Sequence, residues 1–200
     1  MPIGHSALSH KVTRANQKDN ADTYHHPKEK IAQLKKLEGL FKGGDILEVF
    51  GGAGNLTDYY KKVGKVTAMT RESSGDSFHS IYKLRAERKK YNLIDIDSYG
   101  YPDKFFPIVF EMMKDEAYLV FTFPIVGVNA LNGIMEQHFV NYWRATRPTT
   151  GDVVGVLTDQ ALKNWQLLQL LDVQKIKRIW RYFFKVSRIK ATEMTNVRNR

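Results

Sequence analysis

Residues 45–60 read DILEVFGGAGNLTDYY, and this stretch decides the fold class of the chain. Its first six residues form a short apolar run rich in side chains that favour β-strands, and Gly51-Gly-Ala-Gly54 interrupts that run. The residues from Asn55 onward are typical of the start of a helix. The stretch therefore predicts a strand, a glycine turn and a helix, with the turn at the carboxyl end of the strand. Ligands of open α/β sheets bind outside that end.

The flanking sequence continues the alternation of strands and helices. Apolar side chains at helical spacing predict a helix that starts at Pro27 and stops before Gly43. Further strands are predicted at residues 66–69, 92–97 and 117–123. Further helices are predicted at residues 77–90 and 103–115. Elements that alternate in this way through short loops indicate an α/β domain with a mostly parallel sheet.

The last third of the chain has weaker patterns. We predict helices at residues 129–145 and 159–171, the second with Asp159 as its N-cap, and a short strand at residues 153–157. Between residues 174 and 189, aromatic and basic side chains alternate, which predicts one long strand or two paired strands. Alternation of this kind indicates a strand with one wet face, as at a sheet edge or in an antiparallel pair.

Length and composition limit the class of protein. Two hundred residues correspond to about one domain, which we place at residues 24–200, behind a mobile basic arm at residues 1–23. The absence of cysteine excludes a disulfide scaffold, cysteine-ligated zinc and a thiol nucleophile. No apolar run approaches the roughly 18 residues of a membrane span, and the first residues lack the apolar core of a signal peptide. We expect a cytoplasmic protein without a membrane partner.

The positive charge lies at the two ends of the chain. The formal net charge is +10, and residues 171–200 alone carry nine basic and two acidic side chains. A basic surface suits a polyanion, most often a nucleic acid, although a merely solvated face is the alternative. The alternation near the C-terminus leaves Arg178, Arg181 and Lys185 available for phosphates, with the aromatic side chains between them in the core.

The chemistry of the glycine turn favours a cationic ligand. A phosphate-binding P-loop needs Gly-Lys-Ser/Thr, but Asn55 follows Gly54, and the dinucleotide fingerprint G-x-G-x-x-G is also absent. The carboxylate of Glu48 stands beside the turn, where it would attract an amino group or a sulfonium and repel a pyrophosphate. None of the six histidines lies at the spacing of a metal site, so we expect no metal.

The pattern Glu48-x-Phe50-x-Gly52-x-Gly54 resembles the first motif of the class I S-adenosylmethionine-dependent methyltransferases, with Phe50 in place of the commonest glycine. The segment ILEVFGGAGNLT is similar to that of the ribosomal RNA adenine dimethyltransferases. The resemblance implies a Rossmann-like sheet, mostly parallel with an antiparallel edge strand, and S-adenosyl-L-methionine as cofactor. We also expect one β-α unit to be reduced or missing, because the stretch from Gly54 to Leu93 is short for two full units. The resemblance implies that the cofactor contacts are Glu48, Phe50, Gly51, Gly52, Gly54, Asn55, Glu72, Asp76 and Ser77.

A second group of candidate site residues lies at the end of the strand predicted at residues 92–97. Asp95 and Asp97 are two residues apart on that strand and therefore point to the same face, although one of them could instead cap the turn that follows. The segment through Pro102 resembles the fourth motif of the tRNA guanine-N2 dimethyltransferases, with Ser98 in place of the first proline. The resemblance implies Asp97 as proton acceptor, with Asp95 and Tyr99 shaping the site.

We therefore expect methyl transfer from S-adenosylmethionine to a nucleic acid, with a base amine of RNA favoured over DNA. The first alternative is a protein that binds S-adenosylmethionine without transferase activity, as a sequestering or consuming protein or as a partner-binding subunit. The second is a methyltransferase for a small molecule or a protein, against which the basic ends of the chain argue.

Overall fold

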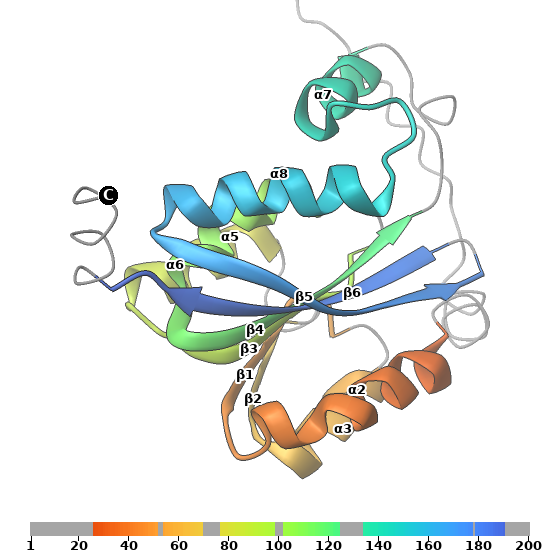
Figure 1. Cartoon of the computed structure of the whole chain (residues 1–200). Coiled ribbons are helices and arrows are strands. Elements are labelled where there is room, and N and C mark those ends of the chain that lie inside the picture. The colour runs from red at the N-terminus through yellow and green to blue at the C-terminus, as the bar shows by residue number, and fades with distance from the viewer. Residues whose placement is uncertain are drawn as a thin grey trace, which may run out of the picture.

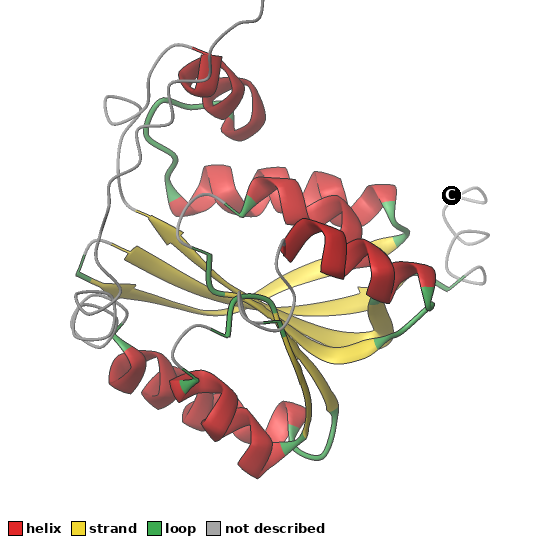
Figure 2. Cartoon of the chain, turned by 180° about the vertical axis from the view of Figure 1, so that it is seen from behind, coloured by secondary structure: helices red, strands yellow, loops and turns green. Residues whose placement is uncertain are grey.

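The computed structural model describes residues 26–51, 54–69, 77–98, 102–124, 134–177 and 179–190, so the arm predicted at residues 1–23 lies outside it. A twisted sheet forms the centre, and helices cover both of its faces (Figures 1 and 2). The strands are β1 (Asp45–Glu48), β2 (Lys65–Ala68), β3 (Tyr91–Ile96), β4 (Met113–Pro124), β5 (Gln166–Ile176) and β6 (Ile179–Arg188). The helices are α2 (Pro27–Phe41), α3 (Asn55–Val63), α5 (Ser77–Ala86), the 3-10 turn η1 (Asp103–Phe105), α6 (Phe106–Glu111), α7 (Ile134–Trp143) and α8 (Thr150–Lys163).

The sheet has the mostly parallel order that the sequence predicts. Its six strands run in the order β2-β1-β3-β4-β6-β5. The pairs among β2, β1, β3 and β4 are parallel, whereas β6 runs antiparallel to both β4 and β5. Among the described residues, α5 is the one element between β2 and β3, which agrees with a reduced β-α unit at this place.

Several predictions for the second half of the chain are wrong. The strand predicted at residues 153–157 lies inside α8, because Val153, Val156 and Leu157 are buried at helical spacing. Thr149, not Asp159, caps this helix: its side chain and that of Asp152 each accept a hydrogen bond from the other's backbone N–H. These reciprocal bonds satisfy two donors of the first turn and so place the start of α8 ten residues before the predicted one.

The remaining differences concern where elements end. The helix predicted to run to residue 171 ends at Lys163, and β5 begins at Gln166. The alternating stretch at residues 174–189 forms the end of β5 and the whole of β6, so the alternative of two paired strands is confirmed. The helix predicted at residues 103–115 ends at Glu111, since Met113 already pairs with Tyr91 of β3.

Two apolar layers hold the sheet between its helices. One lies under α5, α6, α7 and α8, and the other lies under α2 and α3. On the α2–α3 side, Ile46, Leu93, Val120 and Phe183 are fully buried. The next inward-facing positions are polar, because side chains two residues apart in a strand share a face. Glu48, Asp95, Thr122 and Arg181 therefore form a buried polar row near the carboxyl ends of the parallel strands.

Candidate functional site

Three carboxylates meet at the carboxyl ends of β1 and β3. Glu48 is 1% exposed and Asp95 is fully buried, while the side chain of Asp97 is 11% exposed. Glu48 pairs with Asp95 in the sheet register, and Asp95 and Asp97 both lie close to Arg181. The prediction that the two aspartates share a face is therefore confirmed.

Arg181 lies inside this site, and its predicted role as a surface phosphate contact is wrong. The residue is fully buried, and its guanidinium donates to Asp95 Oδ2 at 2.5 Å and to Thr122 Oγ1 at 3.0 Å. Basic and aromatic side chains do alternate along β6, but α2 covers the face that this alternation predicts to be exposed to solvent. Among the other two predicted contacts, Lys185 forms an ion pair of 2.7 Å with Glu116, and Arg178 lies outside the described residues.

Asp97 is held by donors from two other elements. Lys30 of α2 is 2% exposed, and its Nζ lies 2.6 Å from both carboxylate oxygens of Asp97. Thr122 Oγ1 donates to the same carboxylate at 2.6 Å. Burial alone would raise the pKa of Asp97, but the charges of Lys30 and Arg181 and these hydrogen bonds hold that pKa below its ordinary value. Asp97 is therefore ionised, and its oxygens are already engaged.

Asp95 is buried more deeply than Asp97. Tyr60 of α3 donates its hydroxyl to Asp95 Oδ2 at 2.6 Å, beside the guanidinium of Arg181. Burial raises the pKa of Asp95, and the charge of Arg181 opposes that shift. The other carboxylate oxygen, Oδ1, has no hydrogen-bond partner among the described residues. Asp95 thus joins α3 and β6 to the end of β3.

Glu48 is the carboxylate that lacks a basic partner. Thr57 of α3 donates its hydroxyl to Glu48 Oε2, and no salt bridge joins Glu48 to a cation among the described residues. Burial raises the pKa of Glu48 to about 7. A buried carboxylate without a counter-ion is costly, because its charge has lost the stabilisation of water. The position can therefore receive a cationic group from outside the chain.

The turn beside Glu48 has an unusual backbone. Phe50 has φ 113° and Gly54 has φ 89°, a region that residues with a side chain rarely adopt. The ring of Phe50 packs edge-on against Phe105 with 5.2 Å between the ring centroids. A Cβ added at Gly54 would meet nothing within 4 Å, so the space beside this residue is open. Strain at a non-glycine residue is typical of functional sites, where the surrounding structure maintains it.

The remaining predicted site residues are only partly described. Gly51 is buried and donates its N–H to the carbonyl of Met69 at 2.9 Å, and Asn55 begins α3. Ser77 begins α5, but its side chain lies outside what the structure describes. The predicted residues outside the described ranges are Gly52, Glu72, Asp76 and Tyr99.

Sequence reasoning missed four residues of the site: Lys30, Thr57, Tyr60 and Thr122. One signal could have revealed Lys30. It stands four residues before Leu34 and therefore occupies the buried stripe of its helix, where a lysine needs a partner. The other three depend on which strand and helix lie next to β1 and β3, which no local pattern encodes.

Within the described part of the chain, no helix is both long enough and apolar enough to span a membrane.

The comparisons with known proteins find similarity in structure and not in sequence. No protein-family model and no curated protein sequence matches the chain. The structure is similar to Trm1 from Pyrococcus horikoshii in complex with S-adenosyl-L-methionine, with a TM-score of 0.62 at 15% identity over 82% of this chain and 55% of that one. It is also similar to a methyltransferase from Pyrococcus furiosus, with a TM-score of 0.50 at 11% identity over 88% of this chain and 96% of that one. The chain spans about half the length of the Trm1 structure, and similarity at these identities shows a shared fold.

Proposed function

We propose that this chain, which has the class I methyltransferase fold, binds S-adenosylmethionine and transfers its methyl group to a base amine of a nucleic acid, with RNA favoured. The observation that carries the proposal is the state of Glu48. It is buried, has no ion-pair partner among the described residues, and lies at the end of β1 beside the glycine turn. A ligand with an ammonium and a sulfonium group supplies the positive charge that this position lacks.

The residues at the turn fit this cofactor. Glu48 would hold its ammonium group, and the open space beside Gly54 leaves room for the ligand against the backbone. Through the family resemblance, Gly51 and Asn55 extend this contact, and we assign Glu72, Asp76 and Ser77 to the ribose and the adenine. When bound, the cofactor supplies an electrophilic methyl group.

Asp97 is proposed to act on the amine that receives the methyl group. The amine nitrogen becomes positively charged as it takes the methyl group from the sulfonium, whose sulfur keeps the electron pair, and the nitrogen then releases a proton to solvent. An ionised carboxylate close to that nitrogen stabilises the developing charge. Because Lys30 and Thr122 already donate to Asp97, orientation and charge stabilisation suit it better than direct proton uptake. We assign Asp95 and Tyr99 to shaping this part of the site.

The test is methyl transfer from labelled S-adenosylmethionine to total RNA and to DNA. The wild-type chain should label RNA more than DNA. Asp97→Asn should lower turnover by about 10²–10³-fold, the size of a lost charge-stabilising group, with little change in cofactor affinity. Asp159→Asn is the matched control, because Asp159 pairs with Arg144 on the surface of α8 and not in the site. Wild-type turnover in Asp97→Asn would remove Asp97 from the mechanism.

A second candidate is a protein that binds S-adenosylmethionine without transferring its methyl group. The engagement of both Asp97 oxygens by Lys30 favours it, because no carboxylate oxygen is then left to take up a proton directly. Calorimetry separates the two functions. Micromolar cofactor binding together with no label in RNA, DNA, protein or small molecules would support the second candidate and exclude methyl transfer.

A further inference from the structure

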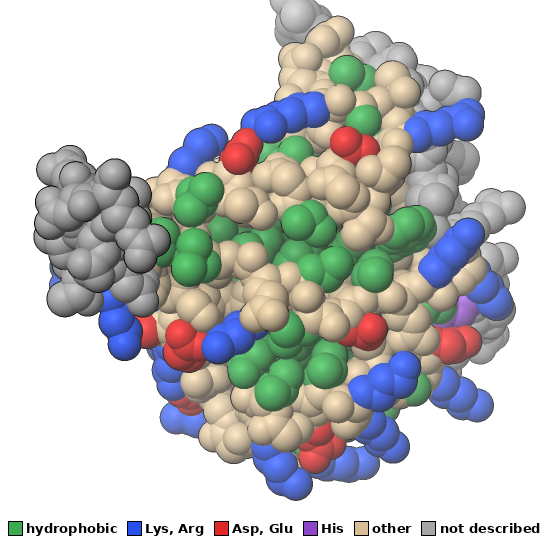
Figure 3. All heavy atoms as spheres, in the orientation of Figure 1, with side chains coloured by type: hydrophobic (Ala, Val, Ile, Leu, Met, Phe, Trp, Pro, Cys, Tyr) green, Lys and Arg blue, Asp and Glu red, His purple; other side chains and the backbone are tan. Residues whose placement is uncertain are grey.

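The layer formed by α2, α3 and the start of β2 carries seven exposed lysines. Basic side chains gather along the lower edge of the molecule in Figure 3, where α2 and α3 lie in Figure 1. The exposed lysines of this layer are Lys28, Lys35, Lys36, Lys42, Lys61, Lys62 and Lys65. Only Lys42 and Lys61 form ion pairs with acidic side chains among the described residues.

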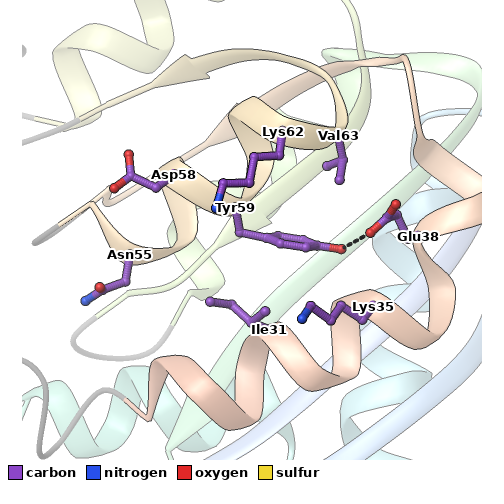
Figure 4. Close-up of a pocket in the computed structure, with 8 residues that line it drawn as sticks. All are labelled: Ile31, Lys35, Glu38, Asn55, Asp58, Tyr59, Lys62 and Val63. Atoms are coloured by element: carbon purple, nitrogen blue, oxygen red, sulfur yellow. Dashed lines mark hydrogen bonds between the residues drawn. The ribbon is translucent and has the colours of Figure 1, made fainter.

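A groove runs between α2 and α3 within this layer (Figure 4). Its volume is about 460 Å³, which is within the range of small-ligand sites. Its lining residues are Ile31, Lys35, Glu38, Asn55, Asp58, Tyr59, Lys62 and Val63. Ile31 is half-buried, whereas Tyr59 and Val63 are each 7% exposed, so the apolar surface open to a ligand comes mainly from Ile31.

Two lysines and two acids line the groove, and both acids also interact with side chains outside its lining. Lys35 of α2 and Lys62 of α3 lie in the space between the two helices and have no ion-pair partner among the described residues. Both acids of the groove are already engaged. Glu38 accepts the Tyr59 hydroxyl at 3.0 Å and pairs with Lys42 at 3.3 Å, while Asp58 pairs with Lys61 at 3.8 Å. Two ammonium groups, one from each helix, are thus left for an anion.

The groove also leads to the proposed active site. Asn55, at one end of it, directly follows the glycine turn at Gly54. On the other wall, Ile31 is the neighbour of Lys30, whose ammonium holds Asp97. An extended chain that lay in the groove would therefore end beside the place where methyl transfer is proposed.

We propose that this groove binds one nucleotide of a single-stranded RNA substrate next to the target base, an inference that rests on the proposed function. Lys35 and Lys62 contact the phosphate, and the base or ribose packs against Ile31. The phosphate contacts position the strand without reading its sequence, since any nucleotide presents the same anion. Of the contacts predicted on β6, the one at Arg181 is excluded, because that side chain is fully buried.

The experiment compares two double variants with the same change in charge. Lys35→Gln with Lys62→Gln removes the groove lysines, whereas the neighbour variant, Lys28→Gln with Lys36→Gln, removes two exposed lysines of α2 that do not line the groove. The probe is a labelled single-stranded RNA of about 12 nucleotides and mixed sequence, titrated at several salt concentrations. Each phosphate contact on a single strand contributes about 0.7 to the slope of log affinity against log salt.

The groove variant should lower that slope by about 1.4 and weaken binding at about 0.1 M salt by roughly 25-fold. The neighbour variant should change both quantities much less. Equal losses in the two variants would mean that only the total charge matters, and would overturn the proposal. An absence of RNA binding by the wild-type chain would overturn it as well.

Two further readouts separate this inference from the proposed function. Cofactor affinity of the groove variant, measured by calorimetry, should equal that of the wild type, and thermal unfolding should confirm an intact fold. In the methyl-transfer assay, the groove variant should raise KM for RNA with kcat unchanged, because a lost phosphate contact weakens substrate and transition state alike. If RNA binding depends on the groove but no methyl group is transferred, the proposed function fails and the groove assignment stands.

Discussion

The raised pKa of Glu48 predicts that cofactor binding depends on pH. The carboxyl group has a pKa of about 7 in the fold, against an ordinary value of 4.5, and burial is the main cause. A cationic ligand requires the ionised form. Below pH 7 the free protein holds a proton on Glu48, and binding must release it, so affinity should fall about tenfold for each pH unit. The decline in affinity should end near the ordinary pKa of a glutamate, because Glu48 then takes up a proton in the complex as well.

The structure sets the size of this effect. Between pH 7 and about pH 5.5, the ionised fraction of a group with a pKa of 7 falls about 15-fold, which is about 1.6 kcal/mol of binding free energy. The assay is isothermal titration calorimetry with S-adenosylmethionine in buffers of different ionisation enthalpy, which also counts protons. Measurements should stay below about pH 7.5, because a free amino group of the ligand titrates near 8. Close to one proton should be released on binding at pH 6.

Glu48→Gln is the control that assigns the effect to one residue. Burial also raises the pKa of Asp95, so a pH slope alone does not identify Glu48. The variant should bind more weakly at pH 7 and lose the pH dependence. A wild-type affinity that is constant across this range, or a slope that persists in Glu48→Gln, would refute the assignment of Glu48 to the ammonium group.

The same pKa shift fixes the sign of a stability effect in the ligand-free protein. A carboxyl with a raised folded pKa contributes stability that is present below its unfolded pKa and is lost as pH rises through its folded pKa. Between pH 4.5 and 7, the wild type should therefore lose up to about 3 kcal/mol relative to Glu48→Gln. Urea unfolding at several pH values measures this difference, and parallel stability curves for the two proteins would contradict it.

Two further predictions concern Arg181 and Phe50. Arg181→Met should lower the free energy of unfolding by about 3–5 kcal/mol in urea titrations, because it leaves the buried Asp95 without its ion-pair partner; a change below about 1 kcal/mol would contradict the buried pair. Phe50→Gly should be more stable than Phe50→Ala by about 1–3 kcal/mol in thermal unfolding, since both lose the ring contact with Phe105 but only glycine relieves the strained φ; equal stabilities would mean that the turn is not strained.

The sequence alone predicted the parallel half of the sheet and the strand ends at which the candidate site residues lie. The run Asp45–Glu48, the glycine turn and the helix from Asn55 are local patterns, so periodicity and turn chemistry were sufficient to predict them. The positions of Glu48 and of the two aspartates of β3 follow from the same rule, because a residue at the end of a parallel strand lies at the ligand-binding edge of the sheet. The common face of Asp95 and Asp97 followed from the two-residue period of a strand.

Only the tertiary structure decided which partners those carboxylates have. Arg181 is 86 residues from Asp95 in the chain, and Lys30 is 67 residues from Asp97, so no local pattern records that they meet. The alternation along β6 predicted one face exposed to solvent, but α2 covers that face, and Arg181 is therefore buried. Whether a charged side chain binds a ligand or a neighbouring strand depends on what packs above it, and packing is a property of the whole chain.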